Sequence, residues 1–277
     1  MGRPNWRAGL TPDERAKLHR HLMEAFAEFD RVCRAQGIPY YLSGGSLLGA
    51  VRHQGIIPWD DDVDVCLLRR DYERFLKVAP HELKDRYFLQ TTRTDPEYFQ
   101  CFAEIRVDGT RFVEASSVDC DIHHGAYIDV FPLDNVPELP AMRWLHAGLC
   151  KILQTMVLAR GKYYDLSPVK NVVAKVLRVL LRPIPFSTLM SWLQAAAQLY
   201  RNDESTYVTI IGGPWSYRRE CAPRRYFANR VELNFGGHSA PAPAMWHEYL
   251  TDLWGDYMTP PPEDERGKWH SIVDLRV

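Results

Sequence analysis

The sequence predicts a mixed α/β fold of the α+β type, in which a sheet-containing core carries a helical insertion. A capped amphipathic helix opens the chain, strand-like and helix-like segments then alternate up to residue 131, and residues 140–200 have the pattern of helices alone. The chain has 277 residues, which is enough for one large domain or for a core with an appended subdomain.

The first helix has the clearest local signal. Thr11-Pro12-Asp13-Glu14 supplies a capping residue, a proline at the first helical position and a glutamate three residues after the cap. Apolar residues then recur at helical spacing from Leu18 to Val32, so we expect this helix to end near Gly37.

Further elements are expected before the helical region, each bounded by turn residues. They are strands at Pro39–Leu42, Val63–Leu68 and Tyr127–Phe131, helices at Ser46–His53 and Arg70–Val78, and several short strands between Tyr87 and Val113. Pro132 is expected to end the third of these strands, because proline cannot donate to a sheet ladder. The helical region is expected to break at Pro168 and again at residues 183–185.

Composition limits the class of protein. Hydrophobic residues make up 46% and charged residues 25%, which is typical of a soluble globular chain. The formal net charge of -1 gives no overall field that would attract nucleic acid. The six cysteines have no metal-ligand spacing. Residues 1–11 are polar, so we do not expect them to act as a signal peptide, and no apolar run is long enough to cross a membrane. We therefore expect reduced thiols, no nucleic-acid partner and a cytoplasmic location.

Gly44, Gly45 and Ser46 lie between an expected strand and an expected helix. Glycine lets the backbone approach an anion closely, and the free N–H groups of a helix start, with the Ser46 hydroxyl, would hold a phosphate there. A Gly-Gly pair before a helix is also ordinary turn chemistry, so this motif alone leaves both interpretations open.

The acidic run Asp60-Asp61-Asp62 precedes a further aspartate, Asp64, at the start of the buried strand. Alternate side chains of a strand share a face, so Asp62 and Asp64 are expected to point the same way, and Asp60 joins them if the strand extends that far. Clustered carboxylates repel one another unless a cation lies between them, and Mg²⁺ prefers carboxylate and phosphate oxygens. The alternative is a solvated acidic loop, against which the neighbouring apolar residues argue.

Asp129 interrupts the otherwise apolar strand around it. Metal binding, an arginine partner or an exposed face would each explain a carboxylate at this position, since a buried unpaired charge is costly. A phosphate-binding turn, paired aspartates and a strand aspartate together predict a metal-dependent phosphoryl-transfer site.

These motifs together resemble a known family. The segment Tyr41–Val65, YLSGGSLLGAVRHQGIIPWDDDVDV, closely resembles the signature of LicD-family proteins, which are phosphocholine transferases of the nucleotidyltransferase superfamily related to the fukutin-type ribitol-phosphate transferases. Residues 128–134 resemble the second block of the family. Residues 249–262 resemble the C-terminal block, with Trp254 where tyrosine is expected, and His270 resembles the terminal histidine.

The resemblance implies a polymerase-β-like nucleotidyltransferase core with a mixed sheet. With the change of character near residue 138, we expect this core at residues 1–138, a helical subdomain at 139–204 and a C-terminal segment at 205–277 that completes the active site.

The resemblance also implies a cofactor and the residues that hold it. Asp62, Asp64 and Asp129 would be catalytic and would bind Mg²⁺ or Mn²⁺, with Asp60 as a further ligand. Asp129 would also help to remove the proton of the acceptor hydroxyl. Asp61 is expected to face away from the metal and to cap or orient a neighbour.

The same resemblance implies which residues bind the nucleotide-activated donor. Gly44, Gly45 and Ser46 would contact its diphosphate. Arg52 and His53 are conditional phosphate contacts, and Arg52 could equally pair with a nearby aspartate. His270 is a possible further site residue.

The implied reaction transfers phosphocholine, or a related phosphoalcohol, from a CDP-alcohol to a hydroxyl of a cell-surface glycan or teichoic acid precursor. CDP-choline is the first choice of donor, CMP is released, and the glycan acceptor can be lipid-linked. One alternative is a nucleotidyltransferase that modifies a small molecule or protein and releases pyrophosphate. Another is a non-catalytic nucleotide- or glycan-binding module, against which the intact acidic residues argue.

The middle third of the chain is basic. Residues 170–182 alternate apolar pairs with lysine and arginine, a pattern typical of an amphipathic helix on an anionic membrane surface. Such a helix would place the protein at the inner face of the membrane. An ordinary surface helix with its apolar side turned inward fits the pattern as well.

Overall fold

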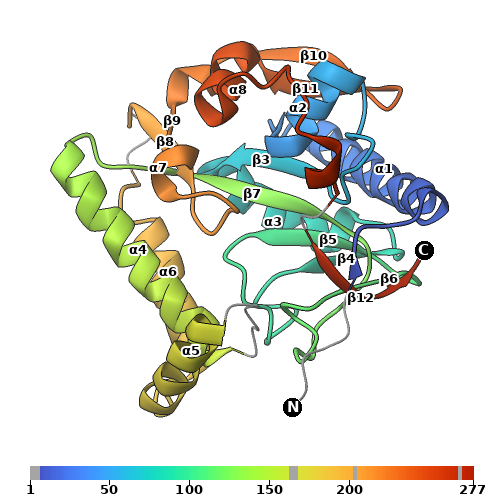
Figure 1. Cartoon of the computed structure of the whole chain (residues 1–277). Helices are drawn as coiled ribbons and strands as arrows, with labels where there is room; N and C mark the ends of the chain where they lie inside the picture. The colour runs from blue at the N-terminus through green and yellow to red at the C-terminus, as the bar shows by residue number, and fades with distance from the viewer. Residues whose placement is uncertain (1–6, 162–167, 202–204, 268–269) are drawn as a thin grey trace.

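A mixed sheet of seven strands runs through the centre of the computed structural model, which describes residues 7–161, 168–201, 205–267 and 270–277 (Figure 1). The strands of the described chain are β1 (Arg7–Ala8), β2 (Tyr41–Leu42), β3 (Asp64–Leu68), β4 (Tyr87–Gln90), β5 (Ala103–Val107), β6 (Arg111–Glu114), β7 (Tyr127–Asn135), β8 (Tyr207–Ile210), β9 (Ala222–Pro223), β10 (Arg230–Phe235), β11 (His238–Pro243) and β12 (Ser271–Arg276).

The central sheet has the order β2-β3-β7-β5-β4, and β8 and β9 extend it from β7. Strands β3 and β7 are parallel, whereas the other neighbours in this sheet are antiparallel. Two smaller sheets flank it, one of β1, β12 and β6 and one of β10 and β11. The expected α+β fold with a mixed sheet is therefore confirmed.

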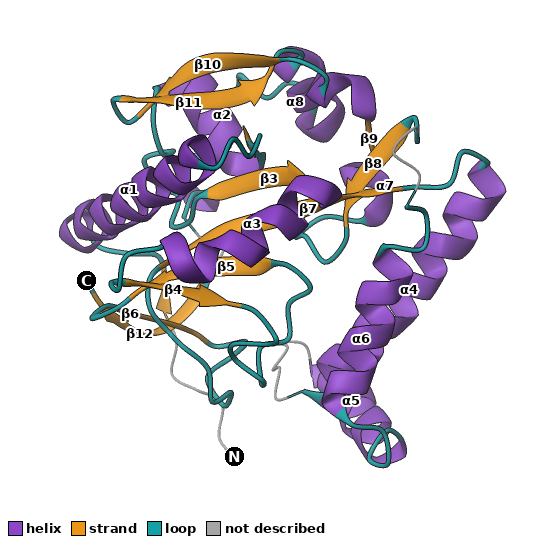
Figure 2. Ribbon diagram, turned by 180° about the vertical axis from the view of Figure 1, so that it is seen from behind, coloured by secondary structure: helices purple, strands orange, loops and turns teal. Residues whose placement is uncertain are grey.

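Helices surround this sheet and extend to one side of it. They are α1 (Pro12–Ala35), α2 (Gly44–His53), α3 (Arg69–Glu82), α4 (Pro140–Arg160), α5 (Pro168–Leu180), α6 (Phe186–Ala197), α7 (Tyr217–Glu220) and α8 (Trp246–Trp254). Helix α3 lies in front of β3 and β7 when the molecule is seen from behind (Figure 2). Helices α4, α5 and α6 stand together beside the sheet, on the side away from α1 (Figure 1).

Helix α1 forms where the capping motif predicts it. The Glu14 backbone N–H donates to the Thr11 hydroxyl at 3.3 Å, and the Thr11 backbone N–H donates to the Glu14 carboxylate at 2.9 Å. The helix buries an apolar stripe that includes Leu18, Leu22 and Phe26 in the main hydrophobic core. It packs against β5, β7 and α3, so one face of the sheet is closed by these two helices.

A second hydrophobic core lies among the helices that follow the main sheet. Leu189 and Leu193 of α6 pack there with Cys150 and Val157 of α4. Because this cluster is separate from the main core, the helices have their own apolar interior. The domain boundaries expected at residues 138 and 204 stay a prediction.

Pro132 does not end its strand, contrary to expectation, because β7 continues through it to Asn135. Along one edge of β7, pairing with β5 stops at Val130 and pairing with β8 starts at Leu133. Pro132 lies between these two ladders, where its missing N–H breaks no bond on that edge.

Further boundaries differ from expectation. Helix α2 starts at Gly44 rather than Ser46, with Gly44 itself at a positive φ, and β3 starts at Asp64 rather than Val63. Asp62 therefore precedes the strand. Among the described residues, no helix is both long and apolar enough to cross a membrane, and the cytoplasmic location stays a prediction.

Candidate metal and phosphate site

Three acidic residues occupy facing positions on adjacent strands of the central sheet. Asp64 on β3 pairs with Asp129 on β7, and Asp129 pairs in turn with Glu104 on β5. Residues directly opposite one another project from the same face of a sheet. The register therefore sets a row of three carboxylates across β3, β7 and β5.

Asp62 joins this row from the segment before β3. Carboxylate oxygens of Asp62, Asp64 and Asp129 all lie within 4.8 Å of one another, a spacing at which one divalent cation can contact all three. The residues expected from sequence to hold metal are thus brought together, with one exception. Asp60 belongs to no such group in the described chain, and its carboxylate lies against Gly45 instead.

The carboxylates of this site are costly to ionise. Burial raises the pKa of Asp62 to about 6. Burial, and then the charges of neighbouring acids, raise the pKa of Asp60, Asp64 and Asp129 well above the usual range. A divalent cation among these oxygens would remove the repulsion that causes part of this shift.

The surroundings of Asp129 distinguish between the three explanations for an acid in this strand, namely metal binding, an arginine partner and an exposed face. Only 9% of its surface is exposed, so it does not lie on a solvated face. The guanidinium of Arg106 is directed to Glu104 rather than to Asp129. The Oδ1 atom of Asp129 is buried and has no hydrogen-bond partner. An orphaned carboxylate oxygen beside two other carboxylates fits a metal ligand.

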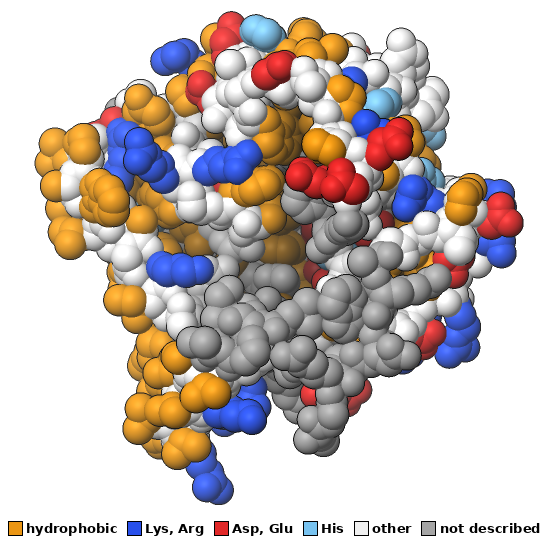
Figure 3. Space-filling model, in the orientation of Figure 1, with side chains coloured by type: hydrophobic (Ala, Val, Ile, Leu, Met, Phe, Trp, Pro, Cys, Tyr) orange, Lys and Arg blue, Asp and Glu red, His pale blue; other side chains and the backbone are white. Residues whose placement is uncertain are grey.

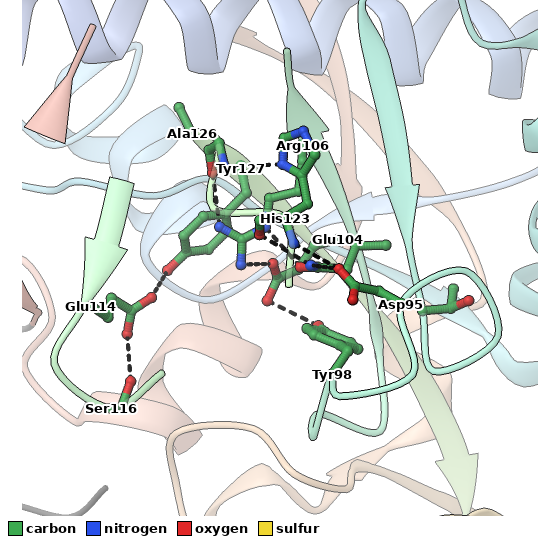
Figure 4. Close-up of polar contacts among 12 residues, drawn as sticks. Asp95, Tyr98, Glu104, Arg106, Glu114, Ser116, His123, Ala126 and Tyr127 are labelled. Atoms are coloured by element: carbon green, nitrogen blue, oxygen red, sulfur yellow. Dashed lines mark hydrogen bonds and ion pairs between the residues drawn. The ribbon is translucent and has the colours of Figure 1, made fainter. Parts of the chain in front are cut away.

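Glu104 and Arg106 form a buried ion pair that supports the acidic row from β5 (Figure 4). Tyr98 donates its hydroxyl to Glu104 at 2.9 Å, and the Arg106 guanidinium lies 4.1 Å from the ring centre of Tyr127. Tyr127 donates in turn to Glu114 at 2.9 Å. The network places one more carboxylate, Glu104, next to Asp129.

Sequence reasoning missed Glu104 and Arg106, although a signal was present. Strand β5 reads Ala-Glu-Ile-Arg-Val, in which charged and apolar residues alternate. All five residues are buried, so the charged side of this strand faces other protein groups rather than water. An alternating strand of this kind indicates a buried polar network when it lies inside a sheet.

The Gly-Gly turn packs directly on the carboxylates. Gly44 has a φ of +50°, and a Cβ atom there would lie 2.6 Å from an Asp64 carboxylate oxygen. A Cβ atom on Gly45 would lie 2.7 Å from an Asp60 carboxylate oxygen, and the Gly45 backbone N–H donates to Asp64. Only glycine leaves space for the acids at both positions.

Ser46 is buried and tied to the same strand. Its hydroxyl oxygen accepts a hydrogen bond of 2.8 Å from the backbone N–H of Asp64. This bond fixes the start of β3 against α2, so Ser46 positions Asp64. Contact of Gly44, Gly45 and Ser46 with a donor phosphate stays a prediction.

Two arginines border the acidic site around Trp59. The guanidinium carbons of Arg52 and Arg266 lie 5.7 Å and 4.5 Å from the Trp59 ring centre. Arg52 donates to His53 at 2.9 Å and to the Tyr257 carbonyl at 3.0 Å, rather than to an aspartate. Burial and then Arg52 lower the pKa of His53, which favours a neutral ring. Arg266 was not expected here, because it lies more than 200 residues from Arg52 along the chain.

His270 reaches the acidic run from the other end of the chain. Its Nδ1 atom lies 2.8 Å from an Asp61 carboxylate oxygen, and Asp61 is buried. Burial lowers the pKa of His270, but Asp61 and Glu114 outweigh it and raise that pKa well above its usual range. This shift favours the protonated ring beside the acids. In its neutral form His270 could instead join Asp61 and Asp62 in a second group of possible metal ligands.

A model of one protein family matches the part of the chain that holds these acids. The matched residues are 37–140, and the family is described as the LicD/FKTN/FKRP nucleotidyltransferase domain. Residues 37–140 are thus similar to the nucleotidyltransferase domain of this family. This segment contains α2, β3, β5 and β7, so the expected resemblance is confirmed where the site is built.

Individual relatives agree with the domain match. The chain is 28% identical to a lipopolysaccharide cholinephosphotransferase of Haemophilus influenzae over 251 residues, which cover 90% of this chain and 92% of that protein. It is 58% identical to the ribitol 5-phosphate transferases FKRP of mouse and human over 40 residues, 14% of this chain and 8% of those proteins. Similarity to the bacterial relative thus extends beyond residues 37–140.

Proposed function

We propose that this chain transfers a phosphoalcohol, phosphocholine in the first instance, from a CDP-alcohol to a hydroxyl of a cell-surface glycan precursor, with release of CMP. One observation carries the proposal. The three carboxylates of Asp62, Asp64 and Asp129 converge within the segment that is similar to the LicD-type domain, and the similarity to a cholinephosphotransferase covers nearly the whole chain.

The metal fits these carboxylates because Asp129 Oδ1 has no partner and the neighbouring acids repel one another. Asp62, Asp64 and Asp129 would hold Mg²⁺ or Mn²⁺, with Asp60 close by. Such an ion neutralises charge on the phosphoryl and leaving oxygens of a diphosphate.

Other residues of the site would bind and orient the donor. Arg52 and Arg266 supply positive charge beside Trp59, next to the acidic site, and would contact the diphosphate from outside the carboxylate row. The Gly44-Gly45 turn allows a close approach to the same place.

In the proposed reaction the acceptor hydroxyl oxygen bonds to the distal phosphorus of the CDP-alcohol. The bond from that phosphorus to the bridging oxygen breaks, and CMP leaves with the bridging oxygen and its electron pair. Asp129 lies among the acids of the site, and we assign the proton of the acceptor hydroxyl to its carboxylate.

The test is to measure CMP release with Mg²⁺, a crude glycan acceptor and a panel of CDP-choline, CDP-ethanolamine, CDP-ribitol and CDP-glycerol. We expect CMP from one donor, and a loss of at least about 100-fold in Asp62→Ala and Asp64→Ala. Asp85→Ala removes an exposed aspartate outside the site and should retain full activity.

Two outcomes would contradict the proposal. CMP release that persists in Asp62→Ala and Asp64→Ala would remove the acidic row from the reaction. Pyrophosphate release from nucleoside triphosphates, with no CMP from any CDP-alcohol, would show nucleotidyl transfer instead.

A further inference from the structure

Exposed apolar side chains are concentrated on the helices beside the sheet. Fifteen large hydrophobic side chains are exposed in the described residues, and thirteen of them lie between Leu139 and Leu199. Scattered exposed apolar residues need no explanation, but a cluster confined to one part of a chain indicates a contact surface.

Two of these helices each carry an exposed apolar stripe. Helix α4 exposes Leu145, Leu149 and Ile152, and helix α5 exposes Val172, Val176 and Val179, all at helical spacing. The other sides of both helices are already used, because α4 buries Cys150 and Val157 and α5 packs Leu177 against the second core. The outer stripes therefore have no partner within the described chain. We call them together the α4–α5 surface.

Trp144 extends the α4–α5 surface next to Leu145. Its side chain is 75% exposed, which is unusual for the largest amphipathic side chain. Tryptophan is enriched where a protein meets the interface between water and lipid headgroups.

Positive charge is gathered on the same helices. Between Pro140 and Arg201 the sequence has nine lysine and arginine residues and one acidic residue, whereas the whole chain has a net charge of -1. Lys151, Lys175 and Arg182 are exposed beside the apolar stripes. Hydrophobic side chains line the edge formed by α4 and α5, with lysine and arginine side chains among them (Figure 3).

We propose that the α4–α5 surface docks on an anionic lipid bilayer. The apolar stripes and Trp144 would enter the interface, and the basic residues would lie against acidic headgroups. The contact is broader than the segment 170–182 predicted from sequence, because α4 contributes Trp144 and one of the two apolar stripes. Helix α4 follows β7, the strand of Asp129, so the docked helices would hold the acidic site near the bilayer. The docking itself does not depend on the proposed function. Only the idea that docking brings the acidic site to a lipid-linked acceptor rests on it.

A second copy of the chain would also cover apolar stripes, but the charge pattern favours lipid. A two-fold contact across the α4–α5 surface would bring its basic residues against a second basic set, with one acidic residue in the region to offset them. An anionic bilayer complements both the apolar and the positive character.

The experiment is flotation of the full chain with vesicles of phosphatidylcholine alone, or of phosphatidylcholine mixed with phosphatidylglycerol, at low and high NaCl. We expect flotation with the anionic vesicles only, weakened by salt. No donor or acceptor is present, so the result is independent of CMP release.

A charge-reversal variant tests the basic residues. Lys151→Glu with Lys175→Glu and Arg182→Glu should weaken vesicle binding on the order of 100-fold, since each basic residue near the bilayer contributes roughly fivefold. The matched control reverses three exposed basic residues of α1 and α3, namely Lys17, Arg20 and Lys77, and should bind as the wild type does.

A second pair of variants tests the apolar stripes. Trp144→Ser with Val176→Ser should reduce flotation about tenfold or more, whereas Val231→Ser with Met258→Ser changes exposed apolar residues elsewhere and should not. Absence of flotation with anionic vesicles, or equal loss in the controls, would overturn the proposal. A dimer in sedimentation that dissociates in the Trp144 and Val176 variant would assign the surface to a second copy instead.

Discussion

At the scale of single residues, Asp129 is a buried acid in a position that is costly to the fold. It is buried beside Asp64 and Glu104, its pKa is raised by burial and by these acids, and its Oδ1 atom has no hydrogen-bond partner. A residue selected for stability alone would not be ionisable there, because an unpaired buried charge is costly. Protonation, which the raised pKa favours, reduces this cost, and in the proposed function a bound cation would offset it.

Replacing Asp129 by asparagine should change the stability of the protein in opposite directions without and with metal. Without metal, Asp129→Asn should raise the free energy of unfolding by on the order of 1 kcal/mol, since it removes repulsion from neighbouring carboxylates. With Mg²⁺ or Mn²⁺ the wild type should gain stability and the variant should not. Urea unfolding in EDTA and in each metal measures both effects. Asp85→Asn is the exposed control, and destabilisation by Asp129→Asn in EDTA would instead make Asp129 a structural residue.

At the scale of elements, the site depends on how closely α2 approaches β3. The turn at Gly44 and Gly45 lies against the carboxylates of Asp64 and Asp60, and Ser46 binds the backbone of Asp64. Helix α2 thus holds Asp64 from two sides while leaving space at its carboxylate. The parallel pairing of β3 with β7 then places Asp129 opposite Asp64.

A pair of glycine variants separates backbone strain from this contact. Gly44→Ala and Gly109→Ala both place a side chain at positive φ, which costs roughly 1–2 kcal/mol. At Gly109 nothing lies within 4 Å of the new Cβ, whereas at Gly44 the Asp64 carboxylate must move. We expect similar losses in thermal stability but loss of metal-dependent stabilisation in Gly44→Ala alone. Equal metal responses in the two variants would contradict the role of this contact.

At the scale of the whole molecule, one hydrophobic core lies under the acidic row and a second lies under the α4–α5 surface. The main core holds the sheet that carries the acids, and the second core holds α4 and α6, whose neighbouring helix α5 shares the exposed basic surface. Because the cores are separate, the helices can be altered with little effect on the acidic row. The expected helical subdomain at residues 139–204 stays a prediction.

Truncation of one leucine in each core tests that separation. Leu193→Ala in the second core and Leu22→Ala in the main core both remove fully buried methyl groups, and each should cost about 2–5 kcal/mol. Hydrogen exchange should become faster in α4 and α6 for Leu193→Ala, with metal binding retained. Leu22→Ala should accelerate exchange in α1 and the central sheet. Uniform acceleration in both variants would show one cooperative unit and contradict the expected boundaries.

The sequence by itself determined the first helix, the turn at Gly44 and the aspartates at positions 62, 64 and 129. These features are encoded by neighbouring residues, through capping, periodicity and the spacing of a motif. Such local signals predict a metal-dependent phosphoryl-transfer site and the α+β class, whereas the mixed sheet was implied by the resemblance to a family. The prediction that Pro132 ends its strand was wrong. At this residue the edge of β7 passes from pairing with β5 to pairing with β8, so the missing N–H of proline breaks no hydrogen bond.

Only the tertiary structure decided which distant groups meet these aspartates. Glu104 faces Asp129 through strand register, and His270 reaches Asp61 across 209 positions of sequence. The alternation in β5 indicates only that Glu104 is buried among polar groups, and the resemblance indicates only that His270 belongs to the site. Their partners depend on register and on how whole elements pack. The same holds for the exposed stripes of α4 and α5, since periodicity marks an apolar side of a helix but only packing decides whether that side is covered.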